Sequence, residues 1–299
     1  MIGIEHSDGR QIEYEALQFS GGERHVSINL SKDKTRSSAS PIRIRANITN
    51  SDDLIDFALI CSAVQAEYQA PIEIELPYLP YARQDRVCAP GQANSLSLMK
   101  AIMGFVPNAK RVSWDTHSQI GIEALGITNV TVVEMLSAIH QASTNDAFTS
   151  LLNHPNTVII APDYGAVRRA KAVADQFGVR CIVCSKHRDP ASGKIDRYDV
   201  PESIDGSHAL IIDDICDGGA TFCLAATDLR QHGAADVSLW VTHGIFSKGV
   251  APLREAGIRA VYTTSSRPDR AIFPDYVKTY AFRYDFNLNK IALIGSEET

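Results

Sequence analysis

The chain has 299 residues, of which 44% are hydrophobic and 21% charged, and its formal net charge is -6. This length accommodates two ordinary domains. The negative charge argues against nucleic-acid binding through bulk electrostatics, and the apolar runs are far shorter than the roughly 18 residues of a membrane span. The cysteines are scattered and residues 1–10 do not resemble a signal peptide, so we expect a cytoplasmic protein with no nucleic-acid and no membrane partner.

The first half of the chain alternates helical and strand-like segments, although less regularly than the second half. The pattern predicts a helix over 52–69, a strand over 71–76, a helix over 96–105 and a strand over 109–114. No Pro- or Gly-rich linker separates the halves. We place a boundary near 136–143, with an N-terminal domain over 1–138 and a C-terminal domain over 139–280.

The second half repeats one pattern, in which a short apolar strand ends in a loop with glycine or aspartate. Strands are expected over 157–161, 181–184, 208–212, 237–242 and 260–263, and helices end at Phe177 and Gln231. Apolar strands that alternate with helices indicate an α/β fold with a mainly parallel sheet covered on both faces. The polar stretch 185–206 is long for a connection and favours a functional lid or a disordered loop.

The segment 210–221 carries the strongest chemical signal (Leu-Ile-Ile-Asp-Asp-Ile-Cys-Asp-Gly-Gly-Ala-Thr). Its small residues allow the backbone to approach a phosphate, and the helix that follows presents free N–H groups to which Thr221 adds a hydroxyl. Asp213 and Asp214 would repel a phosphate directly. We expect them to accept hydrogen bonds from ribose hydroxyls or to hold a magnesium shell. The alternative is an acidic strand end that only caps a helix.

Other segments accompany this one along nearly the whole chain. They are Phe19-Ser-Gly-Gly-Glu23, Pro77–Arg86 (Pro-Tyr-Leu-Pro-Tyr-Ala-Arg-Gln-Asp-Arg), Asp115-Thr-His117, Pro162-Asp163, Lys186-His-Arg188 and Thr242–Ser247 (Thr-His-Gly-Ile-Phe-Ser). In content and order they resemble the ribose-phosphate pyrophosphokinase (PRPP synthetase) family. Ordinary phosphoribosyltransferases share the segment 210–221 but lack a counterpart of Pro77–Arg86.

The resemblance implies a fold and a reaction. The expected fold is α/β, with two tandem type I phosphoribosyltransferase-like domains and a final strand over 280–299 that returns to the first domain. The expected reaction transfers the diphosphate of ATP to the C1 hydroxyl of ribose 5-phosphate, with Mg²⁺ as cofactor. The expected assembly is a homo-oligomer, a dimer or a hexamer, in which Phe19 to Glu23 complete a neighbour's nucleotide site.

The resemblance also assigns roles to residues of this chain. The expected catalytic residues are Lys186 and Arg188, and the expected metal residues are His117 and Asp163. The expected ATP-binding residues are Phe19, Glu23, Arg83, Gln84, Asp85 and Arg86. The expected ribose 5-phosphate-binding residues are Asp213, Asp214, Asp217, Gly218, Gly219, Ala220 and Thr221.

The sequence departs from the family pattern at three places. Gly21 replaces an aspartate expected to recognise the adenine amino group, 217–221 read Asp-Gly-Gly-Ala-Thr instead of Asp-Thr-Gly-Gly-Thr, and His187 replaces the central arginine of Lys-Arg-Arg. These changes leave two other functions open. One is a non-catalytic regulatory subunit similar to PRPP synthetase, and the other is a phosphoribosyltransferase that consumes PRPP.

Overall fold

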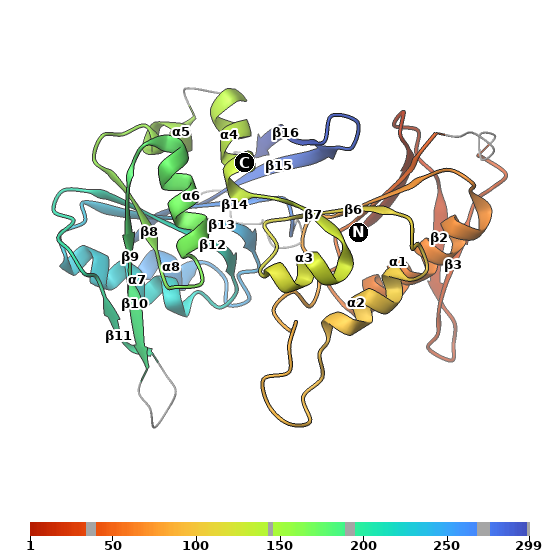
Figure 1. Cartoon of the computed structure of the whole chain (residues 1–299), viewed down its shortest axis with the longest axis horizontal. Helices are drawn as coiled ribbons and strands as arrows, with labels where there is room; N and C mark the ends of the chain where they lie inside the picture. The colour runs from red at the N-terminus through yellow and green to blue at the C-terminus, as the bar shows by residue number, and fades with distance from the viewer. Residues whose placement is uncertain (34–39, 143–145, 189–194, 268–275, 298–299) are drawn as a thin grey trace. The chain divides into compact units, whose positions relative to one another are not determined.

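The protein is represented by a computed structural model that describes residues 1–33, 40–142, 146–188, 195–267 and 276–297. The chain forms two compact units, Met1–Val130 with Phe286–Leu288, and Thr131–Asp285 with Asn289–Thr299 (Figure 1). This division falls before the expected boundary at 138/139, because α4 (Val132–Ala142) packs against α6 (Val167–Phe177) and β16 (Lys290–Glu297) of the second unit.

The first unit is built on a five-stranded sheet. The strand order is β1 (Ile2–His6), β4 (Ile42–Ala46), β5 (Ile72–Leu76), β6 (Lys110–Trp114) and β7 (Ile127–Val130). Only the β1–β4 pair among these is antiparallel. The helices of this unit are α1 (Ser51–Glu67), α2 (Leu96–Met103) and α3 (Gln119–Leu125), and β2 (Tyr14–Gln18) and β3 (Arg24–Ile28) form a separate hairpin.

The central strand β5 is buried along its whole length although it carries two glutamates. Arg43 on the neighbouring strand donates to Glu73 (Nε–Oε2 2.8 Å), and the indole of Trp114 donates to Glu75 (3.1 Å). Charged and hydrogen-bonded partners on both neighbouring strands therefore offset the burial of these carboxylates.

The second unit is built on a seven-stranded sheet in the order β16, β15 (Val277–Asp285), β14 (Ile258–Thr264), β13 (Asp236–Gly244), β12 (His208–Cys216), β8 (Thr157–Ala161) and β9 (Arg180–Val183). Only β15–β16 is antiparallel within it. The chain runs from β8 through α6 to β9 in one direction along the sheet, and from β12 through α7 (Ala220–Gln231) to β13 in the other. Right-handed crossovers therefore put α6 and α7 on opposite faces. The remaining helices are α5 (Ala147–Leu152) and α8 (Ala251–Glu255).

Two mainly parallel sheets flanked by helices confirm the predicted α/β class, but three details differ from the sequence expectations. The last strand does not return to the first sheet, because β15 pairs with β14 and β16 folds back onto β15; only Phe286–Leu288 group with the first unit. Strand β12 extends to Cys216, so both acids lie within it. The stretch 185–206 contains β10 (Ser185–Arg188) and β11 (Ile195–Asp199), which Figure 1 shows as a projecting hairpin.

No helix in the described part of the chain is long and apolar enough to cross a membrane.

Candidate active site

The acid pair lies on β12, an interior strand of the second sheet, and faces Arg169. The Asp213 and Asp214 side chains are 16% and 7% exposed, and that of Arg169 is 10% exposed. Arg169 Nη1 lies 3.7 Å from Asp213 Oδ1, and Nη2 lies 3.5 Å from Asp214 Oδ2. The backbone N–H of Asp214 donates to Asp213 Oδ1 (2.9 Å), and that of Ile215 donates to Asp214 Oδ1 (2.8 Å). The strand and one guanidinium together therefore fix the orientation of both carboxylates.

Burial and the neighbouring charge of Asp214 raise the pKa of Asp213 well above its ordinary value, while Arg169 acts in the opposite direction. Two adjacent carboxylates with little exposure are costly to ionise together. The pair is therefore an unfavourable arrangement for folding alone, which is typical of groups retained for ligand binding.

The turn after β12 is suited to bind a phosphate. Gly219 has a positive φ of 77°, α7 begins at Ala220, and Gly219 as the N-cap residue has no side chain to cap the first N–H groups. A Cβ on Gly219 would lie 3.0 Å from the Leu253 side chain, so the turn is closely packed on one side. The Asp217 carbonyl accepts from the Ser247 N–H (3.1 Å), which connects the segment 242–247 to the turn. Free N–H groups at a helix start attract anions.

Lys248 lies over the same turn. Its aliphatic carbons would contact a Cβ on Gly218 at 3.5 Å, and in the described part of the chain its ammonium makes no ion pair. The turn thus has an available positive charge that the sequence reasoning did not identify, since the motif ends at Ser247.

The Pro162–Asp163 turn follows β8, which neighbours β12. Asp163 Oδ1 accepts the backbone N–H groups of Gly165 (2.8 Å) and Ala166 (3.2 Å), and the Tyr198 hydroxyl donates to the Pro162 carbonyl. Tyr198 on β11 pairs with Lys186 on β10. The backbone that carries Lys186 and Arg188 is therefore anchored to this turn, whereas the side chains of residues 186–188 lie outside the described part of the structure.

In the first unit, Asp85 connects two of the expected nucleotide-binding loops. Its carboxylate is 4% exposed; Oδ1 accepts from Arg86 Nε (2.9 Å) and Oδ2 accepts the hydroxyl of Ser118, the N-cap of α3. The hydrogen bonds from Arg86 and Ser118 lower the pKa of Asp85. This carboxylate braces the Pro77–Arg86 loop against the loop that carries His117.

The other expected nucleotide residues of the first unit are exposed. These are Arg83, Gln84, Arg86 and His117 on the two loops, and Phe19 and Glu23 on the β2–β3 turn. Phe19 is 53% exposed and its N–H donates to the Glu23 carbonyl (2.9 Å). Tyr81 and Asp115 have positive φ values of 61° and 38°, which shape the turns before Arg83 and His117.

Among the described residues, no group of three or more His, Cys, Asp or Glu side chains is arranged to hold a metal ion. Magnesium is commonly bound through one or two carboxylates together with substrate phosphates. Asp163 supplies an oxygen donor of this type, so it fits a magnesium ion that binds with its nucleotide.

Comparisons with known proteins agree with this geometry. Residues 134–257 match the phosphoribosyl transferase domain model. The chain is 30% identical over 225 residues to a ribose-phosphate pyrophosphokinase of Rhizobium meliloti, covering 74% of this chain and 70% of the relative. It is 28% identical over 264 residues to that of Pyrococcus abyssi, covering 87% and 86%. The chain belongs to the ribose-phosphate pyrophosphokinase family.

The fold has a counterpart among solved structures of the family. Phosphoribosylpyrophosphate synthetase from Mycobacterium smegmatis superposes with a TM-score of 0.74 at 24% identity, covering 92% of this chain and 87% of that one. At this identity the similarity establishes the fold.

The sequence reasoning missed Arg169, which lies two residues into α6. The signal was available: an Arg-Arg pair (168–169) opens the helix that follows β8, and β8 neighbours the strand with the acid pair. The pattern could not show which arginine faces the sheet, because helix phase depends on where α6 begins.

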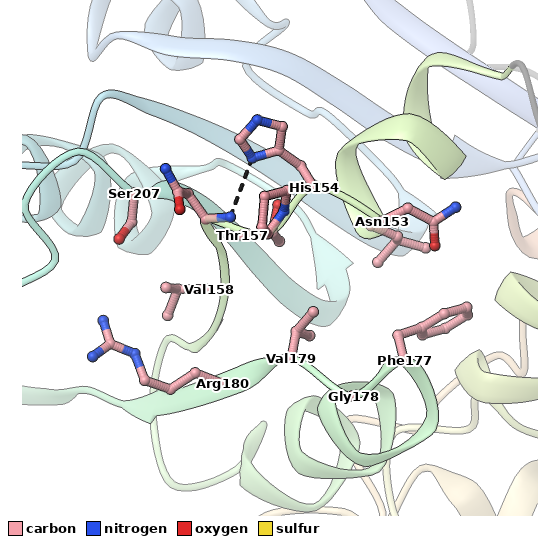
Figure 2. Close-up of a pocket in the computed structure, with 12 residues that line it drawn as sticks. Asn153, His154, Thr157, Val158, Phe177, Gly178, Val179, Arg180 and Ser207 are labelled. Carbon is pink, nitrogen blue, oxygen red and sulfur yellow. Dashed lines mark hydrogen bonds between the residues drawn. The ribbon is translucent and has the colours of Figure 1, made fainter.

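A cavity of about 460 Å³ lies elsewhere in the second unit (Figure 2). It is lined by residues at the amino ends of β8, β9 and β12, including Thr157, Arg180 and Ser207, and by His154, whose Nδ1 accepts the Asn156 N–H (3.2 Å). The acid pair lies toward the carboxyl end of β12, so this cavity is separate from the candidate active site.

Proposed function

We propose that this chain is a catalytic ribose-phosphate diphosphokinase that makes PRPP and AMP from ATP and ribose 5-phosphate. The supporting observation is the continuous segment β12–α7, which combines two oriented carboxylates with an uncapped helix start. A sugar phosphate has the complementary layout, with hydroxyls on the ring and an anion at one end. The relatives from Rhizobium meliloti and Pyrococcus abyssi are ribose-phosphate pyrophosphokinases, which supports ribose phosphate as the acceptor.

We assign each part of ribose 5-phosphate to a chemical group of this segment. Asp213 and Asp214 accept hydrogen bonds from the ring hydroxyls. The 5-phosphate binds to backbone N–H groups of the turn 217–221, to the Thr221 hydroxyl and to the Lys248 ammonium. This arrangement keeps the carboxylates away from the phosphate they would repel.

The reaction is an in-line displacement. The oxygen of the C1 hydroxyl bonds to the β-phosphorus of ATP, the bond between that phosphorus and the bridging oxygen to the α-phosphate breaks, AMP keeps the bridging oxygen, and the hydroxyl proton passes to solvent. Positioning and charge neutralisation supply most of the catalysis in such transfers. Lys186 and Arg188 neutralise the migrating diphosphate, and Arg83 and Arg86 bind the nucleotide phosphates.

Magnesium, held with its nucleotide through Asp163 and His117, would neutralise the phosphate oxygens. Phe19 and Glu23 contribute to nucleotide binding from an exposed hairpin turn, which suits a site completed by a second copy of the chain. We therefore propose a homo-oligomer, a dimer or a hexamer. Gel filtration with light scattering that finds a fully active monomer would contradict this assembly.

The deciding experiment measures AMP release from ATP and magnesium with and without ribose 5-phosphate. Wild type is compared with Lys186→Ala and with Lys290→Ala, an exposed lysine at the start of β16 that serves as a matched control. We expect release that depends on ribose 5-phosphate, falls by about 100-fold or more in Lys186→Ala and is unchanged in Lys290→Ala.

The changed turn 217–221 and Gly21 leave room for one competing function, a non-catalytic regulatory subunit similar to PRPP synthetase that binds partners without turnover. Wild type that binds ribose 5-phosphate but releases no AMP with ATP, GTP or other nucleotide donors would support that function instead.

A further inference from the structure

Arg169 occupies an unusual position for an arginine on a surface helix. It lies in the first turn of α6, only 10% of its side chain is exposed, and its guanidinium faces the sheet. The preceding residue, Arg168, is exposed. Burying an arginine requires compensating negative charge, and two nitrogens of the group face two different aspartates, Asp213 and Asp214.

The distances indicate what kind of interaction this is. At 3.7 and 3.5 Å the nitrogen–oxygen pairs are longer than direct hydrogen bonds, so the contact is chiefly electrostatic or bridged by water. One oxygen of each aspartate accepts a backbone N–H of the strand. The guanidinium therefore holds the two carboxylates as a pair while it leaves them in reach of a ligand hydroxyl.

The Arg169 guanidinium offsets part of the electrostatic cost of burying two adjacent carboxylates. Burial and the charge of Asp214 raise the pKa of Asp213, and the Arg169 guanidinium lowers it. Removing the guanidinium therefore removes a charge that favours ionisation of the pair. Such a pair takes up a proton or turns away, and then accepts fewer hydrogen bonds.

We propose that Arg169 is a positioning residue that balances the charge of Asp213 and Asp214 and aligns both carboxylates for the ring hydroxyls of the sugar phosphate. Arg169 thereby sets the affinity for ribose 5-phosphate and leaves that for ATP unchanged. This inference rests on the proposed function, because it takes ribose 5-phosphate as the ligand of the acid pair.

The experiment measures dissociation constants for ribose 5-phosphate and for ATP separately, by calorimetry, in Arg169→Met, Arg169→Lys and the neighbouring control Arg168→Met. Truncating one member of a buried charge pair weakens binding by about 30-fold or more, so we expect that loss for ribose 5-phosphate in Arg169→Met. We expect ATP affinity within about 2-fold of wild type, partial recovery in Arg169→Lys because the charge is kept, and no change in Arg168→Met.

A second measurement tests the ion pairing without any ligand. Urea unfolding is compared for Arg169→Met, Asp213→Asn and the double variant. If Arg169 balances the acid pair, Asp213→Asn offsets part of the stability lost in Arg169→Met, so the two effects are not additive. The double variant also provides a folded protein if Arg169→Met does not fold, and Arg169→Lys still tests the binding.

The outcomes separate this inference from the proposed function. Equal affinity for ribose 5-phosphate in wild type and Arg169→Met overturns the inference alone, as does an equal loss of affinity for both ligands. Wild type that binds no ribose 5-phosphate overturns the proposed function and the inference together, while non-additive unfolding would still establish the ion pair.

Discussion

The candidate binding residues of the two units are built in opposite ways. In the second unit, the groups that we propose bind the sugar phosphate lie on β12 and on the turn that follows it, with carboxylates oriented by backbone N–H groups and Arg169. In the first unit, most nucleotide groups are exposed on loops, and the buried carboxylate of Asp85 serves to brace those loops. Rigid elements position a ligand more accurately than loops do. Sugar-phosphate binding should therefore depend on single buried groups, and nucleotide binding on several exposed ones.

The largest test of this difference is Gly219→Val. The positive φ of 77° strains a β-branched side chain, and its Cβ would lie 3.0 Å from Leu253. We expect ribose 5-phosphate affinity to fall by about 100-fold, equivalent to roughly 3 kcal/mol, with ATP affinity unchanged. Calorimetric titration of each ligand measures both.

Gly178→Val is the matched control. Gly178 also has a positive φ, of 66°, but a Cβ there meets open space at the end of α6. It should lower stability and leave ribose 5-phosphate affinity intact. If Gly178→Val weakened that affinity as much as Gly219→Val did, the effect would reflect general strain rather than the phosphate turn.

The acids of the two units should respond oppositely to pH. Asp85 has a lowered pKa, so it contributes stability that is present above the ordinary value of 3.8 and is lost as pH falls through its folded pKa. Asp213 has a raised pKa, so its contribution is favourable below 3.8 and is lost as pH rises through its folded pKa. At neutral pH, we expect Asp85→Asn to cost about 1 kcal/mol and Asp213→Asn to contribute about 1 kcal/mol of stability.

Urea unfolding at neutral pH and near pH 4 checks both signs. The gain of Asp213→Asn should shrink as the solution is acidified, since wild-type Asp213 then becomes neutral as well. A loss of stability in Asp213→Asn at neutral pH would mean that the acid pair stabilises the fold, and the contrast between the units would fail.

Much of the fold could be predicted because each strand and helix leaves a local pattern. The strands at 157–161, 237–242 and 260–263 and the helix end at Gln231 were confirmed, since apolar runs and glycine stops mark them directly. The placement of residues 290–297 was wrong. Their pairing with β15 depends on which sheet has an open edge, and no local pattern reports that.

The candidate site shows the same limit. The turn 217–221 could be read from small residues after an apolar strand, because the chemistry lies within one segment. Arg169 and Lys248 could not be predicted in this way, because each contacts the segment from another part of the chain. Arg169 lies on α6, and Lys248 follows the 242–247 segment. Side-chain partners distant in sequence are determined by topology and helix phase.

The smallest expected effect is that of Lys248→Met, and it tests whether the phosphate turn relies on the backbone or on side-chain charge. Lys248 is exposed and its carbons lie over Gly218, so solvent would screen the contact that we propose between its ammonium and the 5-phosphate. Exposed charge pairs contribute little, and we expect affinity for ribose 5-phosphate to fall by about 3-fold, with a smaller difference at high salt. Calorimetry at two salt concentrations measures this, with Lys290→Ala as control. A loss as large as that of Gly219→Val would show that the lysine is a principal phosphate ligand. Sugar-phosphate binding by the second unit would then depend on an exposed group, as we propose for nucleotide binding by the first unit.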